Sequence, residues 1–254
     1  MSKNFEVLVR AERETDFFEP VSIPTEMAHP PRHVPLPTNR PSVHIDAAVH
    51  EEEMRLVQRV FLLPGSQSPG MVVFCAVDHA AGAAGICARA AENLAAQTTS
   101  QVCIIDGNLH SPSLHSYFGL KNDHGLTDVV LQPGSMRNFV NALPGNNLSL
   151  LCAGPRCDES PALWKSDRLR SLMAEIRKEF RYILIYAPPA ITHVDAALLG
   201  QLADGVILIV ESNITRRETA RKAKEAFVAA NVKVLGAVLN NRTFPIPEFL
   251  YRKL

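Results

Sequence analysis

Residues 71–97 read MVVFCAVDHAAGAAGICARAAENLAAQ, an apolar run followed by a loop of small residues and then a helical pattern. The apolar run, Met71–Val77, is nearly continuous and rich in β-branched side chains, which is typical of a strand buried on both faces of a parallel sheet. The pattern over Ala83–Gln97 predicts a helix. A strand that leads through a short loop into a helix is the first half of a βαβ unit, so this stretch indicates an α/β fold.

The same alternation continues to the end of the chain. Five further apolar runs predict strands: Val102–Ile105, Leu148–Leu151, Tyr182–Tyr186, Val206–Val210 and Val234–Leu239. Helical patterns lie between several of them: Ser166–Phe180, Val194–Leu202 and Arg216–Ala230. Right-handed crossovers between such strands give a doubly wound, mostly parallel sheet flanked by helices. Ligands of such sheets bind at the carboxyl ends of the strands, so the residues at those ends are the candidate site.

The segments around this core predict three regions. Residues 1–47 hold seven of the 18 prolines and no apolar periodicity, so we expect a largely disordered arm that forms neither a ladder nor a long helix. Residues 48–242 form the α/β domain, which opens with an amphipathic helix over Ile45–Leu63. In that helix we expect one apolar face, made by Met54, Val57, Val60 and Phe61. Residues 243–254 are a C-terminal tail.

Composition excludes several classes of function. The 26 basic and 26 acidic residues cancel, so no charge argument favours binding to nucleic acid or to an acidic membrane. No apolar run reaches the ~18–20 residues of a membrane span, and the N-terminus carries charges where a signal peptide is apolar. We therefore expect a cytoplasmic protein that reaches the inner membrane only through a partner.

Cysteine and histidine patterns predict no metal site. Cys75, Cys87 and Cys103 lie in apolar segments and are best explained as small buried hydrophobes. Cys152 and Cys157 have no second pair to complete a four-ligand zinc site. The nine histidines are scattered, without an HxxxH or HxH pair, and we interpret them as structural or solvated.

The loop after the first strand has the outline of a phosphate-binding loop, whose pattern is G-x-x-x-x-G-K-[ST]. Gly82 fits the last glycine, but Ala83 and Ala84 occupy the lysine and Ser/Thr positions, and Asp78 adds a negative charge. The missing lysine would bond the phosphates and the missing hydroxyl would hold magnesium. Losing both costs ~3–6 kcal/mol, or roughly two to four decades of nucleotide affinity.

The tips of two other strands also depart from a nucleotide hydrolase. Asp106 ends the second strand and Asn108 follows, an amide that can donate a hydrogen bond but cannot act as a base. Tyr186 ends the fourth strand, where a hydrolase has a carboxylate that organises magnesium. From the residues alone, two readings stay open: a degenerate nucleotide site, or a sheet that serves only as a scaffold.

Three longer blocks resemble the cytoplasmic domain of the bacterial tyrosine autokinases (BY-kinases), the MinD-related P-loop proteins of capsule and exopolysaccharide synthesis. They are residues 104–131, 150–210 and 215–241, within a similarity that covers roughly 50–242. The first block resembles the family pattern D-x-D-x-R followed by P-S-L-H-x-x-F-G-x-x-x-x-x-G-L-x-D-x-L. Its matching residues are Asp106, Pro112, Ser113, Leu114, His115, Phe118, Gly119, Gly125, Leu126 and Asp128. The resemblance implies a P-loop NTPase-like fold of the MinD and BY-kinase type.

The resemblance also shows what differs here. Active members carry lysine and Ser/Thr where this chain has Ala83 and Ala84, a second aspartate and an arginine where it has Asn108 and His110, and an aspartate at Tyr186. Active members phosphorylate a C-terminal tyrosine cluster, whereas this tail, FPIPEFLYRKL, has one tyrosine. These differences predict no catalytic residue, and a vestigial nucleotide site made by Gly82, Ala83, Ala84, Asp106, Asn108, Tyr186 and Asn240.

The family also self-associates through an E-x-x-R-x-x-R helix. Glu52 and Arg55 fit its first two positions, and the third is Gln58 with Arg59 beside it. Self-association through Glu52, Arg55 and Arg59 is one interpretation of this helix, and a solvated charged face is the other.

Three functions follow as hypotheses. The first is a non-catalytic partner in polysaccharide synthesis, which docks on a co-polymerase-like inner-membrane protein that regulates chain length, or on an active homologous kinase, and which needs no cofactor. The second is an atypical ATP-binding tyrosine kinase or ATPase, with weak ATP or ADP binding through magnesium. The third is a nucleotide sensor in which Asn240 contacts a base without turnover.

Overall fold

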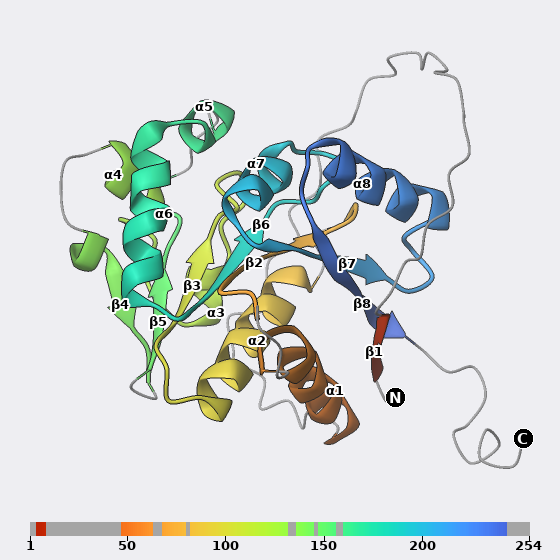
Figure 1. Cartoon of the computed structure of the whole chain (residues 1–254). Helices are drawn as coiled ribbons and strands as arrows, with labels where there is room; N and C mark the ends of the chain where they lie inside the picture. Colours follow the sequence, from red (N-terminus) through yellow and green to blue (C-terminus); the bar gives the residue numbers. More distant parts are fainter. Residues whose placement is uncertain are drawn as a thin grey trace, which may run out of the picture.

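The computed structural model describes residues 4–8, 47–62, 68–79, 82–131, 136–144, 147–155 and 160–242. Its centre is an eight-stranded sheet with the order β1-β8-β7-β2-β6-β3-β5-β4 (Figure 1). The six inner strands run parallel, whereas β1 and β4 pair antiparallel at the two edges. The strands are β1 Asn4–Leu8, β2 Met71–Ala76, β3 Val102–Asp106, β4 Val140–Ala142, β5 Leu148–Leu151, β6 Tyr182–Ala187, β7 Gly205–Glu211 and β8 Val234–Arg242.

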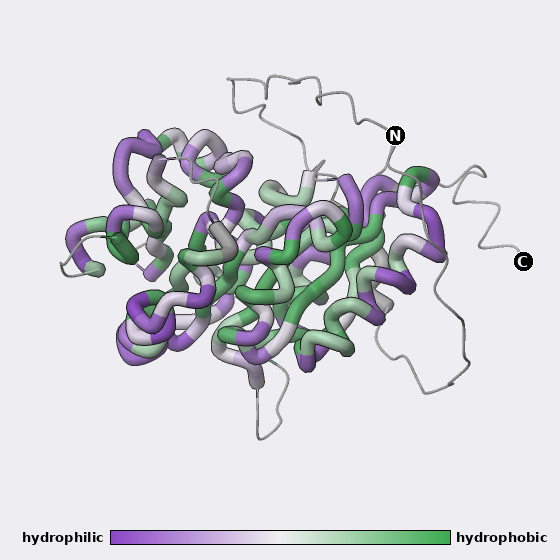
Figure 2. Tube along the Cα trace, turned by 90° about the horizontal axis from the view of Figure 1, so that it is seen from above, coloured by the Kyte–Doolittle hydropathy of each residue, from purple (hydrophilic) through white to green (hydrophobic). Residues whose placement is uncertain are grey.

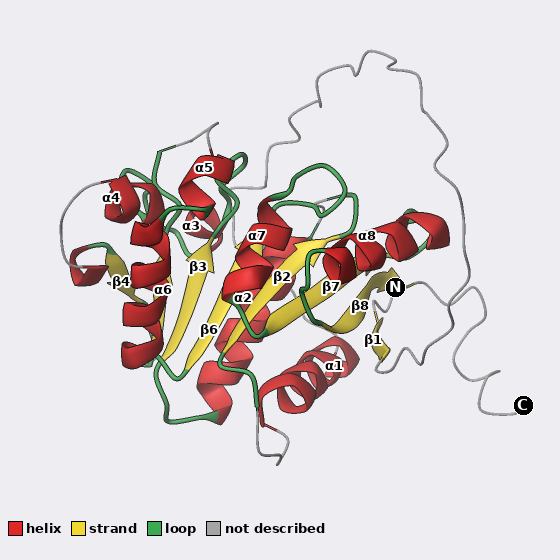
Figure 3. Ribbon diagram, turned by 45° about the horizontal axis from the view of Figure 1, so that its top comes forward, coloured by secondary structure: helices red, strands yellow, loops and turns green. Residues whose placement is uncertain are grey.

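Helices cover both faces of this sheet (Figure 3). They are α1 Ala47–Val57, α2 Ala83–Gln97, α3 Leu114–Tyr117, α4 Leu126–Leu131, α5 Ser160–Trp164, α6 Asp167–Glu179, α7 Asp195–Leu202 and α8 Arg217–Ala229. A π-helical turn, Gln58–Leu62, continues α1, and a 3-10 turn spans Met136–Asn138. The predicted doubly wound, mostly parallel α/β fold is confirmed.

Two hydrophobic cores lie on opposite faces of β2, because successive side chains of a strand point to opposite sides. Met71, Val73 and Cys75 pack with α4, α6, α7 and α8, while Val72 and Phe74 pack with α1 and α2. All five side chains are fully buried, and the interior of the sheet is the most apolar part of the tube in Figure 2. Burial on both faces explains the continuous apolar runs in the sequence.

The structure corrects the expectation that nothing in residues 1–47 joins a ladder. Asn4–Leu8 forms β1, which pairs antiparallel with β8. Its sequence, NFEVL, lies before the first proline at position 20, and β8 would otherwise leave an open strand edge. The proline-rich remainder of that arm and the tail 243–254 lie outside the described residues.

The first helix also differs from its prediction. The α-helix ends at Val57 and continues as the π-helical turn, and the buried face is made by Glu53, Leu56, Val57 and Phe61. Val57 and Phe61 of the predicted set are thus confirmed, whereas Glu53 and Leu56 take the place of the other two. Met54 and Val60 of that set are only half-buried. In the part of the chain that the structure describes, no helix is both long enough and apolar enough to cross a membrane.

Candidate functional site at the carboxyl ends of the strands

Gly82 carries the chain from the loop after β2 into α2. Its φ of +77° lies in the left-handed region that favours glycine, and a Cβ there would stand 2.9 Å from the Asn240 side-chain nitrogen. Ala83, the first helical residue, is fully buried, and Ala84 is half-buried. The structure therefore places Gly82 beside Asn240 and keeps the glycine turn at the helix start. It has methyl groups at the two positions that would supply a cation and a hydroxyl.

The carboxyl group of Asp106, at the tip of β3, is fully buried. One oxygen accepts hydrogen bonds from the backbone N–H groups of Ser113 and Leu114, both at 2.9 Å, and the other accepts from Asn108 N–H at 3.2 Å. Burial raises the pKa of Asp106 to about 6, although the three N–H donors oppose the rise. This carboxylate thus binds the start of α3 and its own loop, and it has no surface open to solvent.

Tyr186 lies next to Asp106, because the two are register partners in the parallel pair β3 and β6. The Asn108 side-chain amide donates a 3.2 Å hydrogen bond to the phenol oxygen, and both side chains are 2% exposed. Burial raises the pKa of Tyr186 to about 12, so the phenol stays uncharged at neutral pH. The structure brings Asp106, Asn108 and Tyr186 together as one closed hydrogen-bonded cluster.

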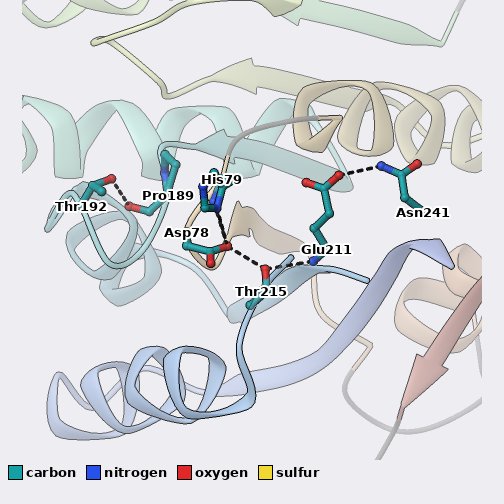
Figure 4. Close-up of polar contacts among 7 residues, drawn as sticks. All are labelled: Asp78, His79, Pro189, Thr192, Glu211, Thr215 and Asn241. Carbon is teal, nitrogen blue, oxygen red and sulfur yellow. Dashed lines mark hydrogen bonds and ion pairs between the residues drawn. The ribbon is translucent and has the colours of Figure 1, made fainter. Parts of the chain in front are cut away.

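A second polar group joins the loop after β2 to the end of β7, as Figure 4 shows. The Thr215 hydroxyl donates to Asp78 at 2.7 Å and accepts from Glu211 N–H at 3.2 Å. Partial burial alone would raise the pKa of Asp78, but hydrogen bonds from Thr215 and His79 outweigh it and lower the pKa. The buried Glu211 carboxyl accepts from Asn241 at 2.8 Å. The loop that would receive phosphates therefore carries a negative charge, held in place by a threonine.

Sequence reasoning used Asp78 but missed Thr215 and Glu211. Glu211 ends β7, which is the neighbour of β2 in the sheet. Its position at a strand tip was the available signal, since Asp106, Tyr186 and Asn240 had been considered on that ground.

Sequence reasoning also missed a group of two histidines and a carboxylate. His110 lies in the loop after β3, and His193 and Asp195 lie in the loop and first turn after β6. The His110 Nε2 is 3.3 Å from the Asp195 Oδ1, and the rings of His110 and His193 stack at 4.1 Å. Trp164 donates its indole N–H to the same Asp195 oxygen at 2.6 Å. Burial, followed by the charge of His110, lowers the pKa of His193, although Asp195 opposes the change.

The residues considered for self-association lie on α1 and its π-helical turn. Arg55 forms ion pairs with Glu51 and Glu52 on the exposed side of the helix, and Arg59 is also exposed. A π turn holds more residues than an α turn, so it rotates the chain less per residue. In this turn Arg59 therefore lies nearer to the side of Glu52 and Arg55 than it would in a regular α-helix. In the family pattern, the second arginine stands at the position of Gln58 and lies on that same side.

No family model matches the chain, whereas individual proteins do. The tyrosine-protein kinase YwqD of Bacillus subtilis is 36% identical over 155 residues, which are 60% of this chain and 65% of that protein. The putative tyrosine-protein kinase CapB of Staphylococcus aureus is 29% identical over 57% of this chain and 64% of its own length. The tyrosine-protein kinase wzc of Salmonella typhimurium is 23% identical over 67% of this chain and 24% of its own length. In each case the match covers less than two thirds of the relative.

Solved structures share the fold. The chimerical protein CapA2B2 superposes with a TM-score of 0.74 at 24% identity, over 80% of this chain and 88% of that one. The kinase domain of the Escherichia coli tyrosine kinase ETK gives 0.72 at 18% identity, over 85% and 86%. MinD of Pyrococcus horikoshii, solved with Mg-ADP, gives 0.53 at 15% identity, over 66% and 68%. The chain is thus a homologue of the bacterial tyrosine-protein kinases, with the fold of BY-kinase domains and MinD-like ATPases.

Proposed function

We propose that this chain is a non-catalytic, pseudokinase-like regulatory or scaffolding partner in capsule or exopolysaccharide biosynthesis. It docks on a chain-length-regulating membrane protein or on an active tyrosine kinase of the same pathway. The pathway and the partners follow from the resemblance to the BY-kinases. The residues at the strand tips support the absence of catalysis.

The observation that carries the proposal is the closed cluster of Asp106, Asn108 and Tyr186. Magnesium in nucleotide sites is bound by phosphate oxygens, waters, a hydroxyl and one or two protein carboxylates that face the phosphates. Here the surviving carboxylate is fully buried and bonded to three backbone N–H groups, and its neighbours are an amide and an uncharged phenol. To reach Asp106, a magnesium ion would have to break the hydrogen bonds of this cluster and lose water molecules from its own hydration shell.

The phosphate side of the site supports the same conclusion. Ala83 is fully buried in the apolar core that also contains Tyr186, so its methyl group offers nothing to a phosphate. The Asp78 carboxylate, fixed by Thr215, adds charge of the wrong sign to the loop. The two lost interactions should weaken nucleotide binding by ~3–6 kcal/mol, which would turn a micromolar affinity into a millimolar one or weaker. The Asp78 charge opposes a phosphate further.

An autophosphorylation assay tests the catalytic half of this proposal. The purified chain, incubated with Mg-ATP labelled on the γ-phosphate, should incorporate no label on tyrosine. An active homologous kinase in the same assay is the positive control. Magnesium-dependent labelling of this chain alone would instead establish the atypical kinase of the second hypothesis.

Reconstitution with candidate partner proteins tests the proposed docking and regulation. The chain should co-purify with a chain-length-regulating membrane protein or an active kinase from its own host, and it should change that kinase's rate of autophosphorylation. The matched control is the kinase with an equal amount of an unrelated α/β protein. If the chain neither associates with these proteins nor alters the rate, the proposed scaffolding role is wrong.

A further inference from the structure

Two histidines and an aspartate converge at the carboxyl edge of the sheet, from two loops far apart in the sequence. His110 follows β3, whereas His193 and Asp195 follow β6, and β3 and β6 are neighbours. One ligand atom from each side chain lies within 4.8 Å of the other two.

The spacing fits a small metal ion. Zinc binds imidazole nitrogen and carboxylate oxygen at about 2.0–2.2 Å, so two ligands at a tetrahedral angle are about 3.3–3.5 Å apart. The His110 Nε2 and the Asp195 Oδ1 already stand at 3.3 Å. The His193 ring stacks on that of His110, so it has to turn away from the stack for its nitrogen to reach the same spacing. His193 lies in a loop and is partly exposed, which leaves room for that turn.

The surroundings of Asp195 resemble the outer shell of a metal site. Its carboxyl group is 1% exposed, and burial disfavours a charged carboxylate unless hydrogen bonds or a cation stabilise it. The Trp164 indole N–H fixes its orientation at 2.6 Å. Hydrogen bonds of this kind orient ligating carboxylates and strengthen metal binding. A cation at this point would neutralise a carboxylate that the protein has already oriented.

We propose that His110, His193 and Asp195 bind one divalent transition-metal ion of the zinc class, with a further coordination position open to water or an oxygen ligand. Two imidazoles and one carboxylate are the donor set of such ions, whereas magnesium prefers oxygen ligands alone. This site shares no residue with the phosphate loop or with the cluster of Asp106, Asn108 and Tyr186, and it does not depend on the proposed scaffolding role.

The chain provides its own reporter, because Trp164 is its single tryptophan. The full chain, freed of metal by chelation and dialysis, is titrated with zinc chloride at neutral pH while tryptophan fluorescence is recorded. We expect a saturable change at one zinc per chain with micromolar or tighter affinity. Magnesium chloride at millimolar concentration should produce no such change.

Variants of the two histidine ligands and of Trp164 assign the response to this site. His110→Ala and His193→Ala, both at partly exposed positions, should weaken zinc affinity at least ~100-fold, and Trp164→Phe, measured by calorimetry, about 10–100-fold. The matched control is His124→Ala, which removes an exposed histidine that pairs with Asp128 elsewhere on the molecule. Thermal melting without metal confirms that each variant is folded.

The proposal is overturned by either of two results. One is a parent chain whose tryptophan fluorescence and calorimetric heat do not respond to zinc. The other is zinc binding that His110→Ala and His193→Ala leave as tight as in the parent, which would place the metal on other residues.

Discussion

Single side chains decide the chemistry of the strand tips, and Asp106 shows how. A carboxylate at the end of a parallel strand can face a ligand or turn back to bond the backbone. Asp106 turns back, toward Ser113 and Leu114, and the ring of Tyr186 is buried beside it. This arrangement removes the carboxylate from water, which disfavours its charged form, so Asp106 holds its proton to a higher pH than an exposed aspartate does.

The raised pKa of Asp106 predicts how the free energy of unfolding depends on pH. The pKa of Asp106 is raised from 3.8 to about 6, so between these values the folded protein holds a proton that the unfolded chain has lost. The contribution of Asp106 to stability is therefore lost as pH rises through that window, by about 3 kcal/mol, and is constant above it. Asp106→Asn removes the titration. Urea unfolding at several pH values should show the parent losing stability relative to the variant between pH 4 and 6, and parallel curves would contradict the assignment.

Tyr186 gives a second prediction at this scale. Tyr186→Phe removes the acceptor of the Asn108 amide and should lower the free energy of unfolding by about 1–3 kcal/mol. Tyr186→Asp places a second carboxylate beside Asp106 and should cost more, by at least ~3 kcal/mol at neutral pH. Denaturant titration of both variants measures the two losses. A Tyr186→Asp protein as stable as Tyr186→Phe would mean that the cluster is open to solvent.

Among the helices, α1 is bound to α2 by a charged contact inside an apolar layer. Glu53 is 4% exposed, and its carboxylate accepts hydrogen bonds from Arg89 and Asn93. This contact was not predicted, since the charged face of the sequence pattern lay elsewhere on the helix. It explains why a glutamate can occupy the buried face between α1 and the sheet.

We therefore expect Glu53→Ala to destabilise the protein. It leaves the Arg89 guanidinium, whose side chain is 26% exposed, without its ionic partner, and losing a hydrogen bond between charged groups costs about 1.5–3 kcal/mol. Glu51→Ala, on the exposed side of the same helix, should change stability by less than ~1 kcal/mol. Chemical denaturation compares the two directly. Equal effects would show that α1 does not depend on this ion pair.

At the scale of the whole molecule, the sheet could be predicted because its strands are long, β-branched and buried on both faces. β4 and the helices α3, α4 and α5 could not, since each has three to six residues and too few positions to show a period. β1 was missed because its five residues precede a proline-rich stretch that dominated the composition.

Part of the candidate site could be predicted because the parallel sheet itself could be predicted. The strand tips follow from the parallel sheet, so Gly82, Asp106 and Tyr186 could be identified from the sequence. The direction of the Asp106 carboxylate depends on the register of β3 against β6, which the sequence does not contain. The group of His110 and Asp195 joins residues 85 positions apart, so no local spacing indicates it.

We propose that this chain has lost the nucleotide chemistry of its fold. The most direct measurement is calorimetric titration of the full chain with Mg-ATP, beside the variant Ala83→Lys/Ala84→Thr/Tyr186→Asp checked for folding by circular dichroism. We expect no saturable binding by the parent chain below millimolar concentration. A dissociation constant under about 100 μM, or about 5.5 kcal/mol of binding free energy, would contradict the claim.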